Sequence, residues 1–401
     1  MQVTDELGLA HSCATEESVH QFSGVIDRYL RYATDTMDCL QPVLTADPRF
    51  ATGLIFKCYQ LKMASDPRFK HVIQQTITEL SSLELNDRER RHLTAIQAWF
   101  GDDLQTVTQI LSELLARYPT DLIALKAANH LHFYRGDAES MRIASAASLN
   151  AWPGDQSWRS FVEGMLSFGF EETGHYHEAE THGRAAVAAD PMDMWAAHSV
   201  THALHMQARW DEGLSWLDAC LPRWVNTNNF TNHLHWHKAL MLVDSGNAEA
   251  ALELYDESLV APLKDDFYLD VCNASSLLHR LEMRGLDMTS RWDTLAAYQH
   301  RITDQELIFI TLHYIMIAAR LGDNESLTRG LQSVKAWSAE PIEQGLICET
   351  VGQNLALALQ ALGKGNKERA ATLLEGSFDD LPSIGGSHAQ RALFHELAAH
   401  C

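Results

Sequence analysis

The sequence predicts an all-α protein, a right-handed solenoid of about nine helical hairpins with no sheet. Two kinds of turn alternate along its 401 residues, as expected for one long array. Between the turns, apolar residues recur at helical spacing, as in Leu111, Leu114 and Leu115, and the alternation typical of strands is nearly absent. A hydrophobic content of 46% is enough for a packed core.

The first kind of turn is a glycine followed by a polar residue. These turns stand at Gly101, Gly136, Gly174, Gly246, Gly322 and Gly365. When Arg209 and Gly285 are added in the two gaps, successive turns lie 35 to 43 residues apart. Between them comes proline, which can begin a helix but not continue one. These prolines are Pro119, Pro153, Pro191 and Pro262. Each interval therefore holds two helices.

A period of this length, built of helix, tight turn, helix and proline turn, resembles a degenerate tetratricopeptide repeat. Small residues such as Ala179 and Ala250 stand where the helices must approach closely. No Ser/Gly-rich linker or shift in composition divides the chain, so we expect a single continuous domain over residues 1–401. Stacked hairpins of this kind form a curved array with a concave inner face.

The charge balance argues against nucleic acid and membranes as partners. The chain has 31 Lys and Arg against 53 Asp and Glu, a formal net charge of −22. A surface of this sign repels phosphates and anionic lipid heads. The longest apolar stretch, Leu307 to Leu321, is interrupted by Thr311, His313 and Arg320, so it is too short and too polar to span a bilayer.

The cysteines and the N-terminal residues predict a cytoplasmic protein. Seven scattered cysteines with no Cys-x-x-Cys pair indicate reduced thiols rather than a disulfide framework. The start of the chain, Met1 to Glu6, lacks the basic residues and apolar run of a secretory signal. The sequence leaves open whether the protein forms a homo-oligomer.

Two His-x-x-x-His pairs are the strongest sign of a functional site. A four-residue step places both imidazoles of His198 and His202 on one helical face, and those of His233 and His237 likewise. The second pair follows the first by 35 residues, one repeat length, so the pairs should occupy equivalent places on neighbouring helices. We expect four imidazoles to face one site, as ligands of a divalent transition metal such as Zn, Ni, Cu or Fe.

Other histidines are weaker candidates for the same ligand-binding site. The segment from Trp195 to His237 holds five of the ten tryptophans, and a hydrogen-bonded polar layer of the core is the alternative interpretation of its histidines. His205 lies on nearly the same helical face as His202. His130 and His313 stand on equally apolar segments, where a lone histidine is more often structural.

Glu171 and Glu172 precede the Gly174 turn. One repeat length further is a position about one helical turn beyond His202, so a carboxylate could reach the imidazoles as a base, a metal ligand or an orienting group. The alternative is a solvated charge pair at a helix end. For general acid and base catalysis the candidates are Glu172, His202 and His237.

A polar segment over residues 383–394 is expected to line the same pocket. Two glycines, Gly385 and Gly386, would let the backbone approach a ligand that polar side chains then reach. Those side chains are Ser387, His388, Gln390 and Arg391. We expect replacement of Arg391 by Ala to impair binding of a carboxylate or phosphate ligand with little change in the thermal midpoint.

The same runs of residues resemble the family of proteins similar to tetratricopeptide repeat protein 38. The shared runs are Ser167 to Glu172, Trp195 to Met206, His233 to Leu240, Leu254 to Asp256 and Gly385 to Phe394. The resemblance implies a closed or nearly closed helical-repeat fold with the two His pairs, Glu172 and the Gln390–Arg391 segment at recurring positions, but it supplies no reaction. His205 departs from the family, which often has Glu there.

Two functions follow from these residues. The first is an enclosed His-rich pocket that binds a metal ion or a small polar molecule, with metal-assisted or His/Glu acid-base chemistry as its reaction if the protein is an enzyme. The second is a protein-interaction scaffold that holds a peptide in its concave groove, as many helical-repeat proteins do. A scaffold would show an open groove of Lys, Arg and Asn, whereas the expected inner face holds His, Trp and Glu.

Overall fold

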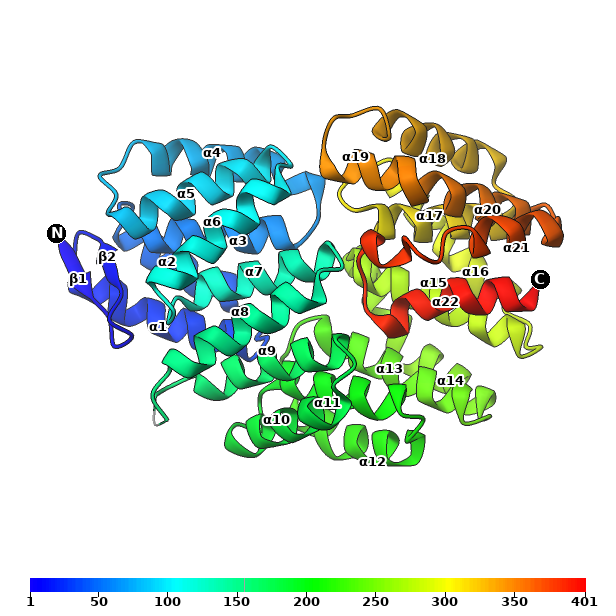
Figure 1. Cartoon of the computed structure of the whole chain (residues 1–401), viewed down its shortest axis with the longest axis horizontal. Coiled ribbons are helices and arrows are strands. Elements are labelled where there is room, and N and C mark those ends of the chain that lie inside the picture. The colour runs from blue at the N-terminus through cyan, green and yellow to red at the C-terminus, as the bar shows by residue number, and fades with distance from the viewer. Residues whose placement is uncertain (155) are drawn as a thin grey trace. The chain divides into compact units, whose positions relative to one another are not determined.

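The computed structural model describes residues 1–154 and 156–401, and it confirms the all-α class (Figure 1). The exception to the expected absence of sheet is an N-terminal hairpin, in which β1 (Gln2–Thr4) pairs antiparallel with β2 (Ala10–Ser12) and Val3 lies opposite His11. Within these two ranges no helix is both long and apolar enough to cross a membrane.

The chain packs as two compact units. Unit 1 comprises Met1–His132, Ala138–Ala203 and Pro222–Asn228, and unit 2 comprises Phe133–Asp137, Leu204–Leu221 and Asn229–Cys401. Each unit has its own hydrophobic core. The single continuous domain over residues 1–401 stays a prediction.

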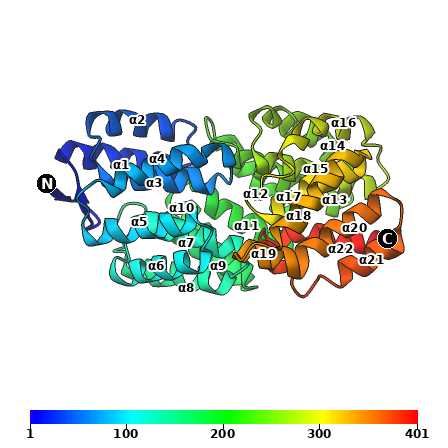
Figure 2. The ribbon, with the colours of Figure 1, turned by 90° about the horizontal axis from the view of Figure 1, so that it is seen from above.

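The helices follow one another in pairs. The first ten are α1 (Glu16–Leu30), α2 (Thr36–Ala46), α3 (Ala51–Met63), α4 (Lys70–Ser81), α5 (Asp87–Phe100), α6 (Leu104–Arg117), α7 (Leu122–Tyr134), α8 (Ala138–Ala151), α9 (Arg159–Glu172) and α10 (Tyr176–Ala189). In unit 1, α3 packs against α4 and also against α5, the first helix of the next pair. Figure 2 shows α1 to α4 side by side in this unit.

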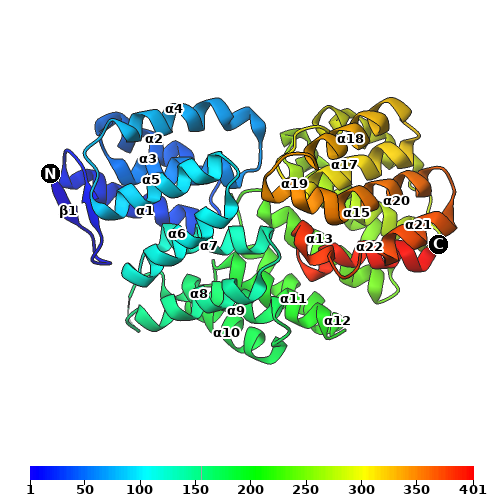
Figure 3. The same cartoon turned by 45° about the horizontal axis from the view of Figure 1, so that its top comes forward.

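The remaining helices continue the pattern. They are α11 (Met194–Met206), α12 (Trp210–Cys220), α13 (Phe230–Asp244), α14 (Ala248–Leu254), α15 (Tyr268–Met283), α16 (Thr289–Leu295), α17 (Ile308–Leu321), α18 (Asn324–Trp337), α19 (Glu343–Ile347), α20 (Gln353–Gly363), α21 (Lys367–Glu375) and α22 (His388–His400). In unit 2 the first helices stack in the order α13, α15, α17 and α20, and α20, α21 and α22 pack in succession (Figure 3).

The number of pairs exceeds the expected nine by one. A π-helical turn over Cys348–Gly352 joins α19 to α20, so the two together serve as the first helix of a pair with α21. On this count the described residues form ten successive pairs, and α22 follows them. The repeating helix pair is the unit that the turn spacing predicts.

The predicted turns adopt the left-handed conformation, with two differences. Gly174 has φ +78°, a value that favours glycine because a side chain would meet the backbone there. At the Gly101 turn the left-handed residue is Asp102, with φ 59°, and at the Arg209 turn it is Ala208, with φ 55°. The turn geometry is therefore kept where a residue other than glycine takes the left-handed position, at a cost of about 1 kcal/mol or more for each such residue.

Helices α9, α10 and α11 approach one another closely in unit 1 because two glycines leave room between them. A Cβ on Gly183 of α10 would lie 2.6 Å from Val200 Cγ2 and 2.8 Å from Ser167 Oγ. A Cβ on Gly164 of α9 would lie 2.9 Å from Ala196 Cβ. Ser167 Oγ also lies 2.6 Å from Ser199 Oγ, so a buried hydrogen bond joins α9 to α11. This packing fixes the positions of the side chains that α9 and α11 present to each other.

We predict that Gly183→Val lowers the free energy of unfolding by about 1–3 kcal/mol, because the added atoms overpack the contact with Val200. Gly24→Val is the matched control, since Gly24 is exposed on α1 and a Cβ there would have no neighbour within 4 Å. We expect the control to stay within about 0.5 kcal/mol of the parent protein in urea unfolding. Equal unfolding midpoints for the two variants would contradict the packing described for α10.

Candidate functional site

The first His pair lies in unit 1 on α11. His198 and His202 are both buried, and their Nε2 atoms are 3.0 Å apart, so one ring donates an N–H to the lone pair of the other. The helical step of four residues produces this stacking directly. Phe168 and Trp195 line the pair, with ring centroids 5.4 Å and 5.2 Å from that of His198. The pair is therefore a polar contact within an aromatic wall.

Two carboxylates of α9 lie beside His202. Glu171 Oε2 is 3.4 Å from His202 Nδ1, an ion-pair distance. One ligand atom from each of Glu171, Glu172 and His202 lies within 4.8 Å of the others. Both carboxylates are buried, so the alternative of a solvated charge pair at a helix end is wrong. Within unit 1 the structure thus brings Glu171, Glu172, His198 and His202 together.

The second His pair lies in unit 2 on α13 and has nearly the same geometry. The Nε2 atoms of His233 and His237 are 3.1 Å apart. Trp236 stacks on His233 with centroids 5.2 Å apart, and it meets His237 edge to face at 4.8 Å. Each pair therefore presents two imidazole nitrogens at one buried spot. The convergence of the two pairs on one site stays a prediction.

Asn273 is a site residue that the sequence reasoning missed. Its Oδ1 lies 3.2 Å from His233 Nδ1, across from α15 to α13. An amide oxygen can only accept, so His233 Nδ1 carries the hydrogen and its Nε2 lone pair is directed at His237. The repeat period could have found it, because Asn273 stands 40 residues after His233, but an isolated Asn has no motif to mark it.

Of the other predicted histidines, His205 and His313 have polar partners of their own. His205 Nε2 pairs with Asp244 Oδ2 at 2.8 Å in unit 2. His313 Nδ1 donates to the carbonyl of Phe309 at 2.8 Å, and burial lowers the pKa of His313 to about 4. In unit 1, burial together with Lys126 lowers the pKa of His130 to about 3. His130 and His313 are thus neutral at pH 7.

The C-terminal segment differs from its expected form. Residues 383–394 are expected to be a polar pocket-lining segment, whereas part of them is helical: α22 begins at His388 and packs against α15 and α21. Ser387 Oγ accepts from Gln390 N at 3.3 Å, and Gln390 Oε1 accepts from Ser387 N at 2.9 Å. These two side chains form a capping box, a signal that Ser followed by Gln three residues later carries in the sequence.

Arg391 is buried and bonds within its own segment. Its guanidinium donates to the carbonyl of Gly386, and Nη2 lies 3.4 Å from His388 Nδ1. The positive φ of Gly386, +79°, turns that carbonyl toward α22. The side chain expected to reach a ligand therefore also holds the turn that precedes α22.

Arg280 links this segment to the helix that carries the second pair. Its Nε donates to Glu396 Oε1 at 2.9 Å and its Nη2 to the carbonyl of Ala389 at 3.1 Å, while the guanidinium lies over the Trp236 ring at 6.0 Å. The end of the chain is thus connected to α13 of unit 2 through one buried cation. Sequence reasoning missed Arg280 because no motif surrounds it.

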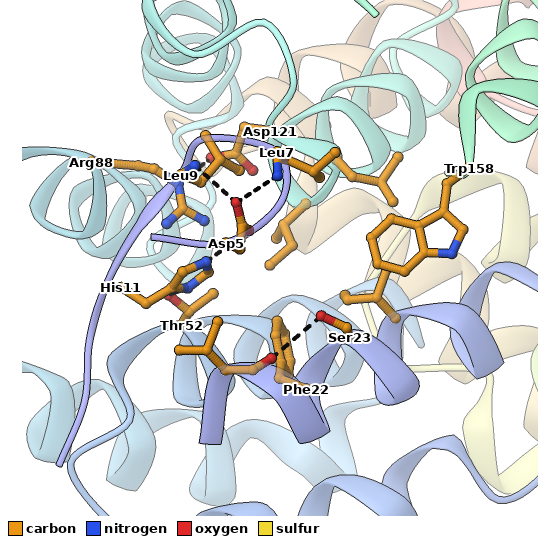
Figure 4. A pocket seen from close by; sticks show the side chains of 14 residues that line it. Asp5, Leu7, Leu9, His11, Phe22, Ser23, Thr52, Arg88, Asp121 and Trp158 are labelled. Atoms are coloured by element: carbon orange, nitrogen blue, oxygen red, sulfur yellow. Dashed lines mark hydrogen bonds and ion pairs between the residues drawn. The ribbon is translucent and has the colours of Figure 1, made fainter. Parts of the chain in front are cut away.

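A pocket outside the predicted site lies under the N-terminal hairpin in unit 1 (Figure 4). His11 joins Asp5 Oδ2 at 2.8 Å and Thr52 Oγ1 at 2.9 Å, while Arg88 Nε donates to Asp121 Oδ2 at 2.7 Å. Apart from Ser23, apolar side chains line the rest of the pocket. Since these polar groups satisfy one another, the arrangement anchors the hairpin to α3 and α5.

No protein-family model matches the sequence, and comparison with solved structures finds chains that align with most of this one. A Rap protein complexed with competence and sporulation factor is 11% identical, with a TM-score of 0.47, over 96% of this chain and 99% of that one. Naa15/Naa10 bound to HypK-THB is 14% identical, with a TM-score of 0.24, over 96% of this chain and 66% of that one.

We predict that Arg391→Ala lowers the free energy of unfolding by about 1–3 kcal/mol, because it removes a buried charged donor from the Gly386 carbonyl. This revises the expectation of an unchanged thermal midpoint. Arg369→Ala serves as the control, since Arg369 is exposed on the neighbouring α21. We expect that control within about 0.5 kcal/mol of the parent. Unfolding of both variants at the parent midpoint would show that the guanidinium does not hold the turn.

Proposed function

We propose that the protein binds a divalent transition metal ion through His198, His202, His233 and His237. The observation that carries the proposal is the buried Nε2 to Nε2 spacing of 3.0 Å in one pair and 3.1 Å in the other. Imidazole nitrogens bind Zn²⁺ at about 2.0–2.1 Å, so two of them on one ion lie roughly 3 Å apart. Each pair is spaced as a chelate.

A single ion shared by both pairs is the form of the site that we propose. The two pairs are one repeat length apart in sequence and have matching internal geometry. Four neutral imidazoles suit Zn, Ni, Cu or Fe, and Glu171 near His202 Nδ1 would orient that ring as carboxylates commonly do behind metal-bound histidines.

An activity at this site would use Glu172. A metal ion supplies Lewis acidity and lowers the pKa of a bound water. Glu172 lies in the same buried group as His202, where its carboxylate would accept a proton. His202 and His237 are the imidazoles that we assign to proton transfer if the ion is absent. The chemistry supported is hydrolysis or another acid-base reaction of a small polar substrate.

Peptide binding is the second candidate function, favoured by a groove in unit 1. The groove holds about 1200 Å³ of empty volume, part of it open solvent, and Arg28, Arg31 and Asn226 are among its lining residues. Arg and Asn are residue types expected in a scaffold groove, and here Arg28 pairs with Asp35 and Arg31 with Asp27 of the same lining. Val225 in its wall is exposed, so peptides selected from a display library should lose binding on Val225→Glu. Selection of no such peptide would remove this candidate.

We also propose membership of the family of proteins similar to tetratricopeptide repeat protein 38. The support lies in the shared runs from Ser167 to Glu172 and from His233 to Leu240, together with the helical-repeat fold. These runs contain the buried carboxylates and the second His pair. The proposal concerns descent and the place of the site, and it brings no reaction with it.

Metal analysis of the full chain, purified without an affinity tag, tests the metal proposal. We expect one equivalent of bound Zn, Ni, Cu or Fe per chain by mass spectrometry of the elements, lost in both the H198A/H202A and the H233A/H237A variants. His300→Ala is the control, because His300 is an exposed histidine on neither pair. Two ions per chain, each lost with one pair, would contradict the shared site, and no ion after incubation with Zn²⁺ would overturn metal binding.

Asn273→Ala should weaken the affinity for added Zn²⁺ by about 10–100-fold, because the group that orients His233 is lost. Asn273→Asp keeps an acceptor at Nδ1 of His233 and should retain most of the affinity. Isothermal titration with Zn²⁺, run beside circular dichroism to verify folding, gives the comparison. Equal affinities for Asn273→Ala and the parent would mean that Asn273 does not orient a ligand.

A further inference from the structure

A half-buried lysine in unit 1 stands among three aromatic rings. Lys126 is on α7, and its Nζ lies 5.5 Å from the ring centroid of Tyr29, 5.6 Å from that of Tyr32 and 5.3 Å from that of Trp195. The first two rings come from α1 and the chain just after it, and the third comes from α11. Three separate segments therefore build a cage around one amine.

The amine has no conventional partner. Among residues 1–154 and 156–401, Lys126 Nζ makes no hydrogen bond and no ion pair, and the side chain is neither fully exposed nor fully buried. Lysines that are partly removed from water are usually paired with a carboxylate or extend their head group to solvent. A lysine held by rings alone is thus available to a ligand.

Asp193 is the carboxylate that acts electrostatically on Lys126. Within the described residues, one of its two oxygens lacks a hydrogen-bond partner. Its Oδ1 accepts from Ala196 N at 2.9 Å at the start of α11, while its buried Oδ2 has no hydrogen-bond partner in the described part of the chain. Burial raises the pKa of Asp193 to about 7 and Lys126 opposes that rise. A carboxyl group that carries a proton near neutral pH leaves Lys126 without a full counter-charge.

Burial also favours the free amine of Lys126, lowering its pKa to about 8. At pH 7 such a group is unprotonated in about a tenth of molecules, a few hundred times more than an ordinary lysine. The three rings favour the ammonium and limit this effect. The charged or titratable groups that face the amine are Tyr29 and Tyr32 from the α1 side, His130 on α7 and Asp193 at α11.

We propose that Lys126 is the nucleophile of a second site, in which its amine forms an imine with a small planar aldehyde held between Tyr29, Tyr32 and Trp195. Desolvated lysines without a counter-ion commonly serve in this way. The aromatic walls favour a flat, apolar carbonyl compound. Trp195 contacts both Lys126 and His198, but none of the four proposed metal ligands takes part in this step, so the inference does not depend on metal binding.

The reaction balances without an oxidant or reductant. The Nζ lone pair adds to the carbonyl carbon, and the π pair of the C=O bond moves to oxygen, which takes up a proton. The nitrogen then releases two protons to solvent, the oxygen takes up a second proton and departs as water, and a C=N bond remains. Because the side chain is partly exposed, water can reach the amine and leave it.

Reductive trapping on the full chain tests the proposal. The protein is incubated at pH 7 with salicylaldehyde and sodium cyanoborohydride, and modified lysines are mapped by peptide mass spectrometry. We expect Lys126 to be labelled at least about tenfold faster than the exposed Lys335, since its free-amine fraction is larger. Tyr32→Leu, which removes one wall, should reduce labelling at Lys126 and leave Lys335 unchanged.

The comparison is internal to the parent protein, so it does not depend on any variant folding. Lys126→Arg is an additional control that keeps the charge and the cage, and it should abolish the fast labelling while the rate at Lys335 stays the same. Labelling of Lys126 no faster than that of Lys335 would overturn the proposal. Fast labelling that persists in Tyr32→Leu would also overturn it, because the rings would then hold no ligand.

Discussion

Close approach of consecutive helices is the constraint on which the rest of unit 1 depends. Gly164 and Gly183 leave no space for a side chain between α9, α10 and α11, and the 2.6 Å contact of Ser167 with Ser199 lies in the seam they create. Because α9 and α11 are held this near, Glu171 and His202 meet one turn further along. The buried acid and imidazole are therefore a product of glycine packing, and an added methyl group would separate them.

A polar group buried between helices needs a hydrogen-bond partner. In the two His pairs, the two rings meet this need for each other. A four-residue step on a helix lets each imidazole supply the partner of the other, at 3.0 Å in α11 and 3.1 Å in α13. On neighbouring helices, Asn273 bonds the outer nitrogen of His233, and Glu171 lies at ion-pair distance from that of His202. Glu171 beside one pair is a carboxylate and Asn273 beside the other is an amide, so the imidazoles of the two pairs would differ in basicity.

The sequence predicted the features that follow from the repeat period. It did not predict the features that depend on single long-range contacts. The 35-residue offset and the turn glycines predicted the helix pairs, and the repeat length applied to Glu171 and Glu172 predicted carboxylates near His202. No sequence motif marks Asn273, Arg280 or the hairpin fixed by His11, since each depends on individual long-range bonds. The Ser387 and Gln390 capping box was readable from the sequence, but the paired glycines before it drew the interpretation toward a ligand contact.

Neutral imidazoles can bind a metal ion, whereas positively charged ones cannot, so the protonation state of the buried histidines decides between the two. Burial lowers the pKa of His130 to about 3 and that of His313 to about 4, which shows how strongly these interiors oppose a positive ring. Within a pair, two nitrogens about 3 Å apart cannot both carry a hydrogen, so at least one lone pair is always directed at the other ring. A divalent ion would take the place of that shared hydrogen, and the lone pairs of both rings could then bind the ion. The overall charge of −22 would favour the entry of such a cation over that of an anionic ligand.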